Sequence, residues 1–389
     1  MKEGWEYKKL GEVCEIIGRI GFRGYTRNDL VEKGEGAITL SPSNIIDGKL
    51  NFEGKVSYIS WDKYFESPEI MLEENNIVFT KTASVGKCAL VKKLPLETTL
   101  NPQLVVLKKI KCCPAFLTYN LQSESFQELV ISQKSGTSIP TVTQSFLGSL
   151  LIPVPPLSEQ KRIVEELDLL SDIIEKQKQQ LKELDTLAQS IFYDMFGDPV
   201  TNEKGWEIKR LKDVAPSKEY FGKIGQVNNK YWLLYLDKVE SHTGKILSKD
   251  YYESNEIGSS TITFDETNIL YSKLRPYLNK VVIPNDTGYA TSELVPLKPD
   301  YHILNRIFFA NLLRSESFVC YISIKVVGAK MPRVSMDDLR NFKVIIPPLP
   351  LQNLFASKIE AIEKQKEAIT KSIEETQKLF DYTMDKYFG

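Results

Sequence analysis

Two stretches of this chain begin almost alike: residues 4–13 read GWEYKKLGEV, and residues 205–214 read GWEIKRLKDV. The chain holds four tryptophans among 389 residues, so a tryptophan that recurs in register within a ten-residue match is not expected by chance. Such an internal repeat is considered before local structure, because it sets the plan of the whole fold. The match predicts that the chain contains two copies of one domain.

Other matches follow in the same order, at a spacing of 192 residues. NNIVFTK ends at Lys81 and TNILYSK ends at Lys273, while LQSESF begins at Leu121 and LRSESF begins at Leu313. Further pairs at this spacing are Pro140 and Pro332, Gln160 and Gln352, and Phe196 and Phe388. Matches in one order at nearly one spacing indicate a duplication of the entire plan.

Each copy has the same internal order. A globular part comes first, with short runs of β-branched and aromatic residues between Gly, Pro and Asn, together with helical stretches such as PAFLTYNLQSESFQELV. This pattern predicts mixed α and β structure. We expect a first globular domain over 1–157, a first long helix over 158–197, a second globular domain over 198–350 and a second long helix over 351–389.

The two long helices show the heptad spacing of a coiled coil. Residues 158–196 contain neither proline nor glycine, and apolar residues recur there at alternating steps of four and three. The predicted seam of the first helix is Ile163, Leu167, Leu170, Ile174, Leu181, Leu184 and Ile191, interrupted by Gln177. The predicted seam of the second is Phe355, Ile359, Ile362, Ile369, Ile373 and Phe380, with Lys366 and Thr376 as polar positions.

Neither helix can bury its seam alone, so the simplest partner of each is the other helix of the same chain. Antiparallel pairing would place the two globular domains at opposite ends of a coiled coil, in a pseudo-two-fold dumbbell of α+β class. Two alternatives remain open from the sequence: the helices could be ordinary linkers, or they could dimerise between chains.

The bulk composition excludes several classes of protein. Five cysteines without a CxxC motif, together with two histidines, favour reduced thiols in a cytosol over a disulfide framework or a zinc site. No apolar run approaches the length of a membrane span, and the first residues lack the apolar stretch of a signal peptide. We expect a cytoplasmic protein. The net charge of −1 excludes a strongly basic non-specific binder of nucleic acid, but it permits localised basic patches.

No convincing catalytic motif is present. The chain lacks the G-x-x-x-x-G-K-[ST] motif of P-loop ATPases, and SVGKCA is better interpreted as a turn. NPQL at Asn101 lacks the second proline and the aromatic residue of the adenine-methyltransferase motif. With two histidines, acid–base chemistry has few candidates. We therefore expect a recognition protein without catalytic residues, bound cofactor or metal.

Basic and hydroxyl side chains gather in loops at matching places of the two copies. The loops YSKLRPYLNK and KVVGAKMPR of the second copy correspond to FTKTASVGKC and QKSGTSIPT of the first. Such residues suit contacts to phosphates and base edges. For any single one, a solvated charge on a turn remains an equal alternative. The predicted DNA contacts are Arg19, Arg23, Lys81, Ser84, Lys87, Lys134, Thr137, Ser138, Thr141, Tyr271, Lys273, Arg275, Tyr277, Lys280, Lys325, Lys330 and Arg333.

The repeated GW start, NNIVFTK and ILYSKLRPYL, the IPPL junctions and QKRIVEELDLLSDIIEKQKQQL resemble the specificity (S) subunit of type I restriction–modification systems. The likeness covers essentially the whole chain. It implies two target recognition domains, each reading one half of an asymmetric bipartite site in double-stranded DNA. It also implies an antiparallel coiled coil that sets the spacing between the half-sites.

The resemblance further implies a non-catalytic subunit that joins two methyltransferase (M) subunits and, with them, restriction (R) subunits. S-adenosylmethionine, ATP and Mg²⁺ are then expected on those partners and not on this chain. Two alternatives stay open: a coiled-coil scaffold whose globular domains bind protein, and an S-like subunit of a related bipartite modification system.

Overall fold

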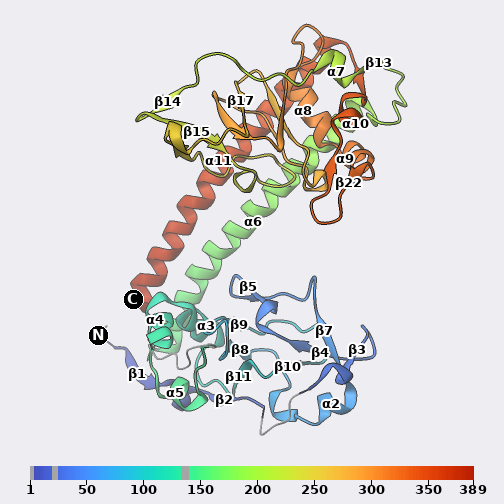
Figure 1. The fold of residues 1–389 in the computed structure, drawn as a ribbon. Helices are drawn as coiled ribbons and strands as arrows, with labels where there is room; N and C mark the ends of the chain where they lie inside the picture. The colour runs from blue at the N-terminus through green and yellow to red at the C-terminus, as the bar shows by residue number, and fades with distance from the viewer. Residues whose placement is uncertain (1–3, 20–24, 133–139) are drawn as a thin grey trace. The chain divides into compact units, whose positions relative to one another are not determined.

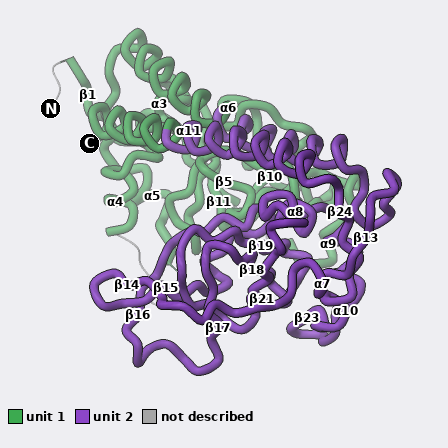
Figure 2. The backbone as a smooth tube through the Cα atoms, turned by 90° about the horizontal axis from the view of Figure 1, so that it is seen from above, with its two compact units in different colours: residues 1–176, 372–389 green, residues 177–371 purple. Residues whose placement is uncertain are grey.

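The structure is a computed structural model that describes residues 4–19, 25–132 and 140–389. The chain divides into two compact units (Figure 2). Unit 1 combines residues 1–176 with residues 372–389, and unit 2 comprises residues 177–371. Each unit therefore holds one globular copy and a segment of both long helices.

Unit 1 mixes short strands and helices, as predicted (Figure 1). Its strands are β1 (Glu6–Lys9), β2 (Glu15–Ile17), β3 (Leu30–Val31), β4 (Gly36–Leu40), β5 (Ile45–Ile46), β6 (Lys49–Leu50), β7 (Ser57–Ser60), β8 (Ile77–Thr80), β9 (Cys88–Leu90), β10 (Thr98–Leu100), β11 (Leu104–Lys108) and β12 (Leu151–Val154). Its shorter helices are α1 (Leu10–Val13), η1 (Arg27–Asp29), η2 (Pro42–Asn44), α2 (Trp61–Phe65), η3 (Pro68–Ile70), α3 (Pro114–Gln122), α4 (Glu124–Ser132) and α5 (Gln144–Ser149).

Two sheets form the centre of unit 1. One has the strand order β10-β4-β7-β3, with β10 and β4 parallel, and the other has the antiparallel order β2-β11-β8-β9. Successive side chains of a strand point to opposite faces. Accordingly Phe79 and Val105 enter one hydrophobic core while Val78 and Val106 enter another. Burial on both faces explains why NIVF and LVVL are continuous apolar runs rather than alternating ones.

Unit 2 repeats this mixture. Its strands are β13 (Glu207–Arg210), β14 (Gln226–Val227), β15 (Lys230–Leu234), β16 (Tyr251–Tyr252), β17 (Thr261–Phe264), β18 (Ile269–Ser272), β19 (Val281–Val282), β20 (Gly288–Thr291), β21 (Leu294–Leu297), β22 (Val326–Val327), β23 (Arg333–Val334) and β24 (Lys343–Ile346). Its shorter helices are α7 (Leu211–Val214), η4 (Leu236–Lys238), η5 (Ser254–Glu256), η6 (Pro276–Leu278), α8 (Arg306–Arg314), α9 (Glu316–Ser323) and α10 (Met336–Arg340).

One part of the globular fold is the same in both units, and another part differs. The antiparallel order β19-β18-β21 corresponds to β9-β8-β11, and β13 pairs with β24 as β1 pairs with β12. The centre of the other sheet is also repeated, because β15 lies between the parallel β20 and the antiparallel β16, as β4 lies between the parallel β10 and the antiparallel β7. The two sheets differ at their edges, where unit 2 adds β17 beside β20 and unit 1 adds β3 beside β7. The duplicated sequence therefore builds a common frame whose second sheet varies at its edges.

The two long helices are α6 (Leu157–Phe196) and α11 (Leu349–Phe388), each of 40 residues. In unit 1, Ile163 and Leu167 of α6 pack with Tyr387 and Phe388 of α11. In unit 2, Phe196 at the end of α6 packs on Phe355 near the start of α11, with ring centroids 5.3 Å apart. Within both units the helix segments are thus antiparallel partners. The helix pairing within one chain agrees with the predicted fold class.

The predicted seam positions are buried or half-buried in the structure. On α6 these are Ile163, Leu167, Leu170, Ile174, Leu181, Leu184 and Ile191, and on α11 they are Phe355, Ile359, Ile362, Ile369, Ile373 and Phe380. The polar position Lys366 is also half-buried, and its Nζ lies 2.8 Å from Asp185 Oδ1 of α6. Heptad spacing did not anticipate Phe192, which is buried against Phe308 and Phe355.

A buried glutamine joins each globular copy to its long helix. In unit 1, Gln160 Nε2 donates to Pro155 O (2.7 Å), and its Oε1 accepts from the backbone N–H of Cys113 (2.8 Å). In unit 2, Gln352 Nε2 donates to Pro347 O (2.7 Å), and its Oε1 accepts from the N–H of Asn305 (2.8 Å). A buried amide needs such partners. The same four atoms therefore repeat 192 residues apart.

The repeated tryptophans take part in packing and hydrogen bonding within their units. Trp5 meets Phe116 edge-on, with ring centroids 6.4 Å apart, and Trp206 donates from Nε1 to Phe196 O at 2.8 Å. The glycines before them, Gly4 and Gly205, have φ of +79° and +70°. Glycine suits this left-handed conformation because it has no Cβ.

Candidate nucleic-acid interface

In unit 1, three backbone hydrogen bonds hold two of the predicted contact loops together. Lys81 follows β8, and its N–H donates to Gln103 O (2.9 Å) while its O accepts from Val142 N (2.9 Å). Ala83 N donates to Pro140 O (3.0 Å). Ala83 has φ of +66°, so the chain turns sharply after Lys81. The segment after β8 thereby lies against residues 140–142 and the turn before β11.

Unit 2 makes the same three bonds at the matching positions. Lys273 N donates to Glu293 O (3.0 Å), Val334 N donates to Lys273 O (3.0 Å), and Arg275 N donates to Pro332 O (2.8 Å). Arg275 has φ of +48°, like Ala83. The backbone frame is therefore repeated, while the side chains on it change from Ala83 to Arg275 and from Thr141 to Arg333.

Some of the predicted contact residues of unit 2 have exposed side chains, and others form ion pairs or ring contacts within the unit. Arg275, Tyr277 and Lys330 are exposed, and Lys273 is half-exposed. Arg333 forms an ion pair with Glu293, with Nη2 2.6 Å from Oε1. Lys325 lies 3.5 Å from Asp338 Oδ1 and 4.7 Å from the ring centroid of Tyr321. The loop around Lys273 thus presents the most accessible cationic groups of this site.

Two of the predicted contacts in unit 2 have structural roles. Tyr271 is 3% exposed and belongs to the core, and its ring meets Phe318 at a centroid distance of 6.0 Å. Its prediction as a DNA contact is wrong, because Tyr271 lies in β18, whose four positions are all buried; burial also raises the pKa of its hydroxyl. Lys280 donates from Nζ to Leu236 O at 2.6 Å, and burial lowers its pKa. Lys280 therefore ties its loop to η4.

Among the predicted contacts of unit 1, Ser84 and Lys87 are exposed and Lys81 and Thr141 are half-exposed. Arg19 Nε donates to Leu100 O at 3.1 Å, its guanidinium lies 5.5 Å from the ring centroid of Tyr25, and burial lowers its pKa. Arg19 thus anchors the segment after β2 to the end of β10. Four further predicted contacts, Arg23, Lys134, Thr137 and Ser138, lie outside the described residues.

Sequence reasoning missed two residues that the fold brings into these sites. Gln103 and Glu293 precede the paired strands β11 and β21, and their carbonyls accept from Lys81 and Lys273. The side-chain carbonyl of Gln103 also accepts from Asn101 Nδ2 at 3.1 Å. Their spacing is 190 rather than 192, so the alignment that found the other pairs does not match them. The pairing of β8 with β11 could have identified them, because it places the residue before β11 beside Lys81.

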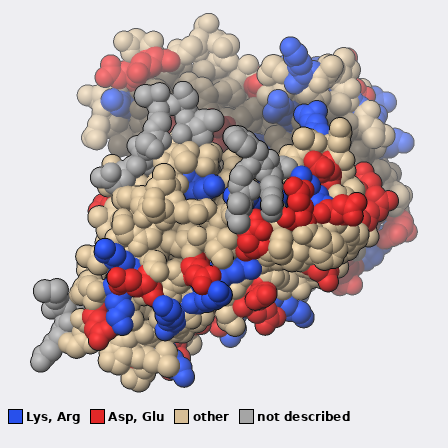
Figure 3. Space-filling view, turned by 90° about the horizontal axis from the view of Figure 1, so that it is seen from below, with Lys and Arg blue, Asp and Glu red and all other residues tan. Residues whose placement is uncertain are grey.

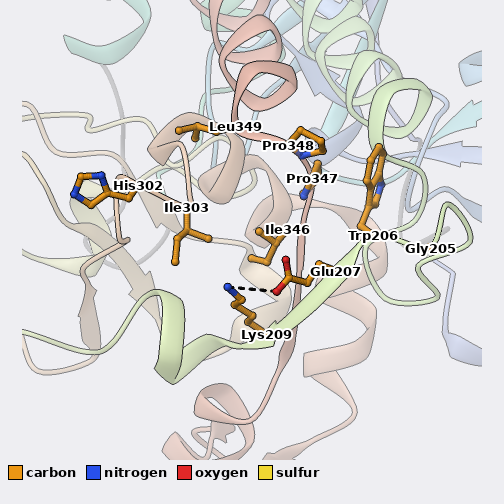
Figure 4. A pocket seen from close by; sticks show the side chains of 10 residues that line it. All are labelled: Gly205, Trp206, Glu207, Lys209, His302, Ile303, Ile346, Pro347, Pro348 and Leu349. Carbon is orange, nitrogen blue, oxygen red and sulfur yellow. Dashed lines mark ion pairs between the residues drawn. The ribbon is translucent and has the colours of Figure 1, made fainter.

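On the side shown in Figure 3, the exposed charges do not gather into one basic face. Lysines and arginines alternate there with aspartates and glutamates. A cavity of about 480 Å³ in unit 2 lies at the junction of β13 with the start of α11 (Figure 4). Trp206, His302 and Pro348 line it, and Lys209 pairs with Glu207 at its floor (3.3 Å). The cavity thus belongs to the helix junction and not to the loops around Lys273.

The duplicated frame corresponds to a known family. The family model described as type I restriction modification DNA specificity domain matches residues 2–185 and again residues 203–378. The chain belongs to this family. The two matches coincide with the two copies of the repeat, so both globular parts are DNA specificity domains. The chain is a specificity subunit, and its partners are DNA and the other subunits of a type I restriction–modification complex.

Known specificity subunits resemble the whole chain. It is 22% identical to the MjaIX specificity subunit of Methanocaldococcus jannaschii, over 92% of this chain and 86% of that protein. It is 25% identical to the MjaVIII specificity subunit of the same organism, over 97% and 90%. A chain from a structural study of type I system assembly and conformational transition has the same fold (TM-score 0.58, 19% identity, 100% and 98% coverage).

The relatives are named as specificity subunits, which agrees with the recognition role expected for this chain. In the described part of the chain, no group of three or more His, Cys, Asp or Glu side chains is arranged to hold a metal ion. Among the described helices, none combines the length and the apolar composition that a bilayer crossing requires.

Proposed function

We propose that each specificity domain reads one half of an asymmetric, bipartite DNA site. The observation that carries this proposal is the repeated set of three backbone hydrogen bonds around Lys81 and Lys273, with different side chains on each copy. Phosphate contacts position a protein on DNA, and side chains at base edges determine the sequence. Because the two copies share a backbone frame but carry different side chains, they read two different half-sites.

The coiled coil of α6 and α11 sets the number of unread base pairs between the half-sites. A helix of 40 residues is about 60 Å long at about 1.5 Å per residue. One turn of B-DNA is about 34–36 Å, so a rod of this length exceeds one helical turn. The coiled coil can set this spacing only if each domain is fixed to its helix, and the buried Gln160 and Gln352 make that connection.

Two methyltransferase subunits dock on this chain, because its duplication offers each of them the same kind of surface. Restriction subunits join the methyltransferase subunits. The partners carry S-adenosylmethionine, ATP and Mg²⁺, and they modify an adenine in each half-site. They also supply much of the phosphate contact, which accounts for a net charge of −1 in a DNA-binding chain. The complex works in the cytoplasm, in accord with five free cysteines.

The test is to purify the chain with its methyltransferase partner and to map N6-methyladenine on DNA treated with the complex. We expect one motif with two short, unlike halves and an unread spacer of constant length. The chain alone should not methylate DNA. A continuous motif, or methylation without sequence preference, would contradict the proposed function.

A further inference from the structure

Arg333 and Glu293 form a two-point ion pair beside Lys273. Arg333 Nε lies 3.0 and 3.1 Å from the two carboxylate oxygens of Glu293, and Nη2 lies 2.6 Å from Oε1. Lys273 lies between the two segments that carry the pair, because its N–H donates to Glu293 O and its O accepts from the N–H of Val334, the residue after Arg333. The backbone therefore holds the segments of Glu293 and Arg333 beside each other.

This arrangement leaves one edge of the guanidinium for a ligand. The carboxylate occupies the edge formed by Nε and Nη2, whereas the edge formed by Nη1 and Nη2 keeps one N–H on each nitrogen. Nη1 lies 3.5 Å from Met331 O, which is at the limit of a hydrogen bond. The side chain of Arg333 is 41% exposed. A planar pair of donors in a fixed orientation matches the O6 and N7 acceptors of guanine in the major groove.

We infer that Arg333 reads a guanine in the half-site of unit 2 and that Glu293 is the positioning residue that orients it. The inference rests on the proposed function and adds to it a base and the residue that selects that base. The new element is the ion pair between Arg333, which reads guanine, and Glu293, whose role the sequence did not reveal.

The carboxylate favours a base contact over a phosphate contact. A phosphate contact depends on charge, and Glu293 offsets the charge of Arg333 and would itself repel a phosphate. Arg275 and Lys330 are exposed and have no ion-pair partner among the described residues, so they suit phosphates better. An exposed ion pair contributes little to stability, which leaves orientation as the useful effect of Glu293.

Unit 1 lacks this pair at the matching positions. Thr141 stands where unit 2 has Arg333, and Gln103 stands where it has Glu293. At this position, among the residues of unit 1 that the structure describes, Thr141 offers no donor fork like that of Arg333. The two domains accordingly differ at the position where Arg333 acts, as two unlike half-sites require.

The experiment uses the complex of the full chain with its methyltransferase partner. Competition binding compares duplexes in which each base pair of the methylated site is replaced in turn, for the wild type, R333K, E293Q, R333A, and E293Q combined with R333A. The control is D250N, which removes a carboxylate from another ion pair of unit 2, that of Lys238 with Asp250 (3.0 Å).

We expect R333K to lower the preference for guanine at one position about tenfold or more, since lysine keeps the charge but loses the fork. E293Q should weaken the preference at that same position, and it should add nothing to R333A alone. D250N should change no position. The inference is overturned if R333K keeps the preference, if E293Q acts equally at all positions, or if its effect adds to that of R333A. The proposed function fails separately, if the wild type shows no bipartite preference.

Discussion

Gln160 and Gln352 occupy equivalent places in the two units, and each bridges a backbone N–H of its globular domain and the carbonyl of a proline before its long helix. They are 3% and 0% exposed. The carbonyl partners belong to buried prolines and the N–H partners to half-buried residues, and the pair of bonds fixes where each domain meets its helix. This relationship underlies the first prediction.

Replacing either glutamine by alanine should lower the free energy of unfolding of its own unit. A partly buried N–H and a buried carbonyl lose their partner in each variant, which costs about 1–3 kcal/mol. Thermal and denaturant unfolding of Q160A and Q352A would measure the loss. Gln180→Ala, at an exposed position of α6, is the control. A loss no larger than that of the control would contradict the assigned role.

The ion pair between Lys366 and Asp185 should respond asymmetrically to substitution. Burial acts to lower the pKa of Lys366, but hydrogen bonds from its ammonium to Asp185 and Glu363 outweigh burial and raise it. The pair therefore stabilises unit 2 at neutral pH, and its contribution is lost as the pH rises through the raised pKa. D185N should destabilise by about 1 kcal/mol, whereas K366M should be neutral or stabilising because it completes the apolar seam.

The measurement is the unfolding midpoint of D185N and K366M between neutral and alkaline pH. Lys364→Met, at an exposed position of α11, controls for loss of a positive charge. If K366M lowers the unfolding midpoint as much as D185N does, the Lys366 side chain stabilises the helix pair through contacts other than its ion pair. That outcome would contradict the prediction.

Tyr271 and Tyr277 should differ in their effects although they stand six residues apart. The Tyr271 hydroxyl is buried and has no hydrogen-bond partner among the residues that the structure describes, so Y271F should keep stability and the methylated motif unchanged. Tyr277 is 47% exposed on the loop beside Arg275. Y277A should weaken binding of the complex to its site. The reverse pattern in competition binding would overturn the placement of these side chains.

The length of the coiled coil should set the DNA spacer. Seven residues inserted after Lys176 and seven after Lys371 preserve the heptad phase and add about 10 Å at 1.5 Å per residue. The spacer of the methylated motif should grow by about three base pairs at about 3.4 Å each, with both half-sites unchanged. Four-residue insertions disturb the seam and should lower stability instead. An unchanged spacer in the heptad variant would contradict the ruler function.

The plan of this chain was predictable because it depends on periodicity. Repeat spacing and heptads persist when single residues change, so both long helices and the mixed domains could be located without a structure. The different edges of the second sheet were not predictable, because short strands such as β3 and β17 carry no signal for their neighbours in space. Phe192 lies off the heptad seam because the end of α6 also packs on α8.

The candidate site was harder to predict than the fold. Lys273 and Arg275 stood out because basic residues in a repeated loop frame are conspicuous in the sequence. Tyr271 could not be separated from Tyr277 by composition, since Tyr271 is buried in β18, whose four positions are all buried, whereas Tyr277 lies in the short helix η6. Glu293 and Gln103 join the site through strand pairing alone, and a two-residue change in spacing hides their equivalence.

The most direct test of the central claim is the N6-methyladenine map of a genome modified by the wild type and by the variant K273A/R275A/K330A, each with the methyltransferase partner. The account predicts that the variant loses or relaxes one half-site while the other half-site and the spacer persist. A control variant, K212A/K245A/K343A, alters exposed lysines elsewhere in unit 2 and should leave the map unchanged. An identical map for K273A/R275A/K330A, or equal loss at both half-sites, would contradict the claim that each unit reads its own half.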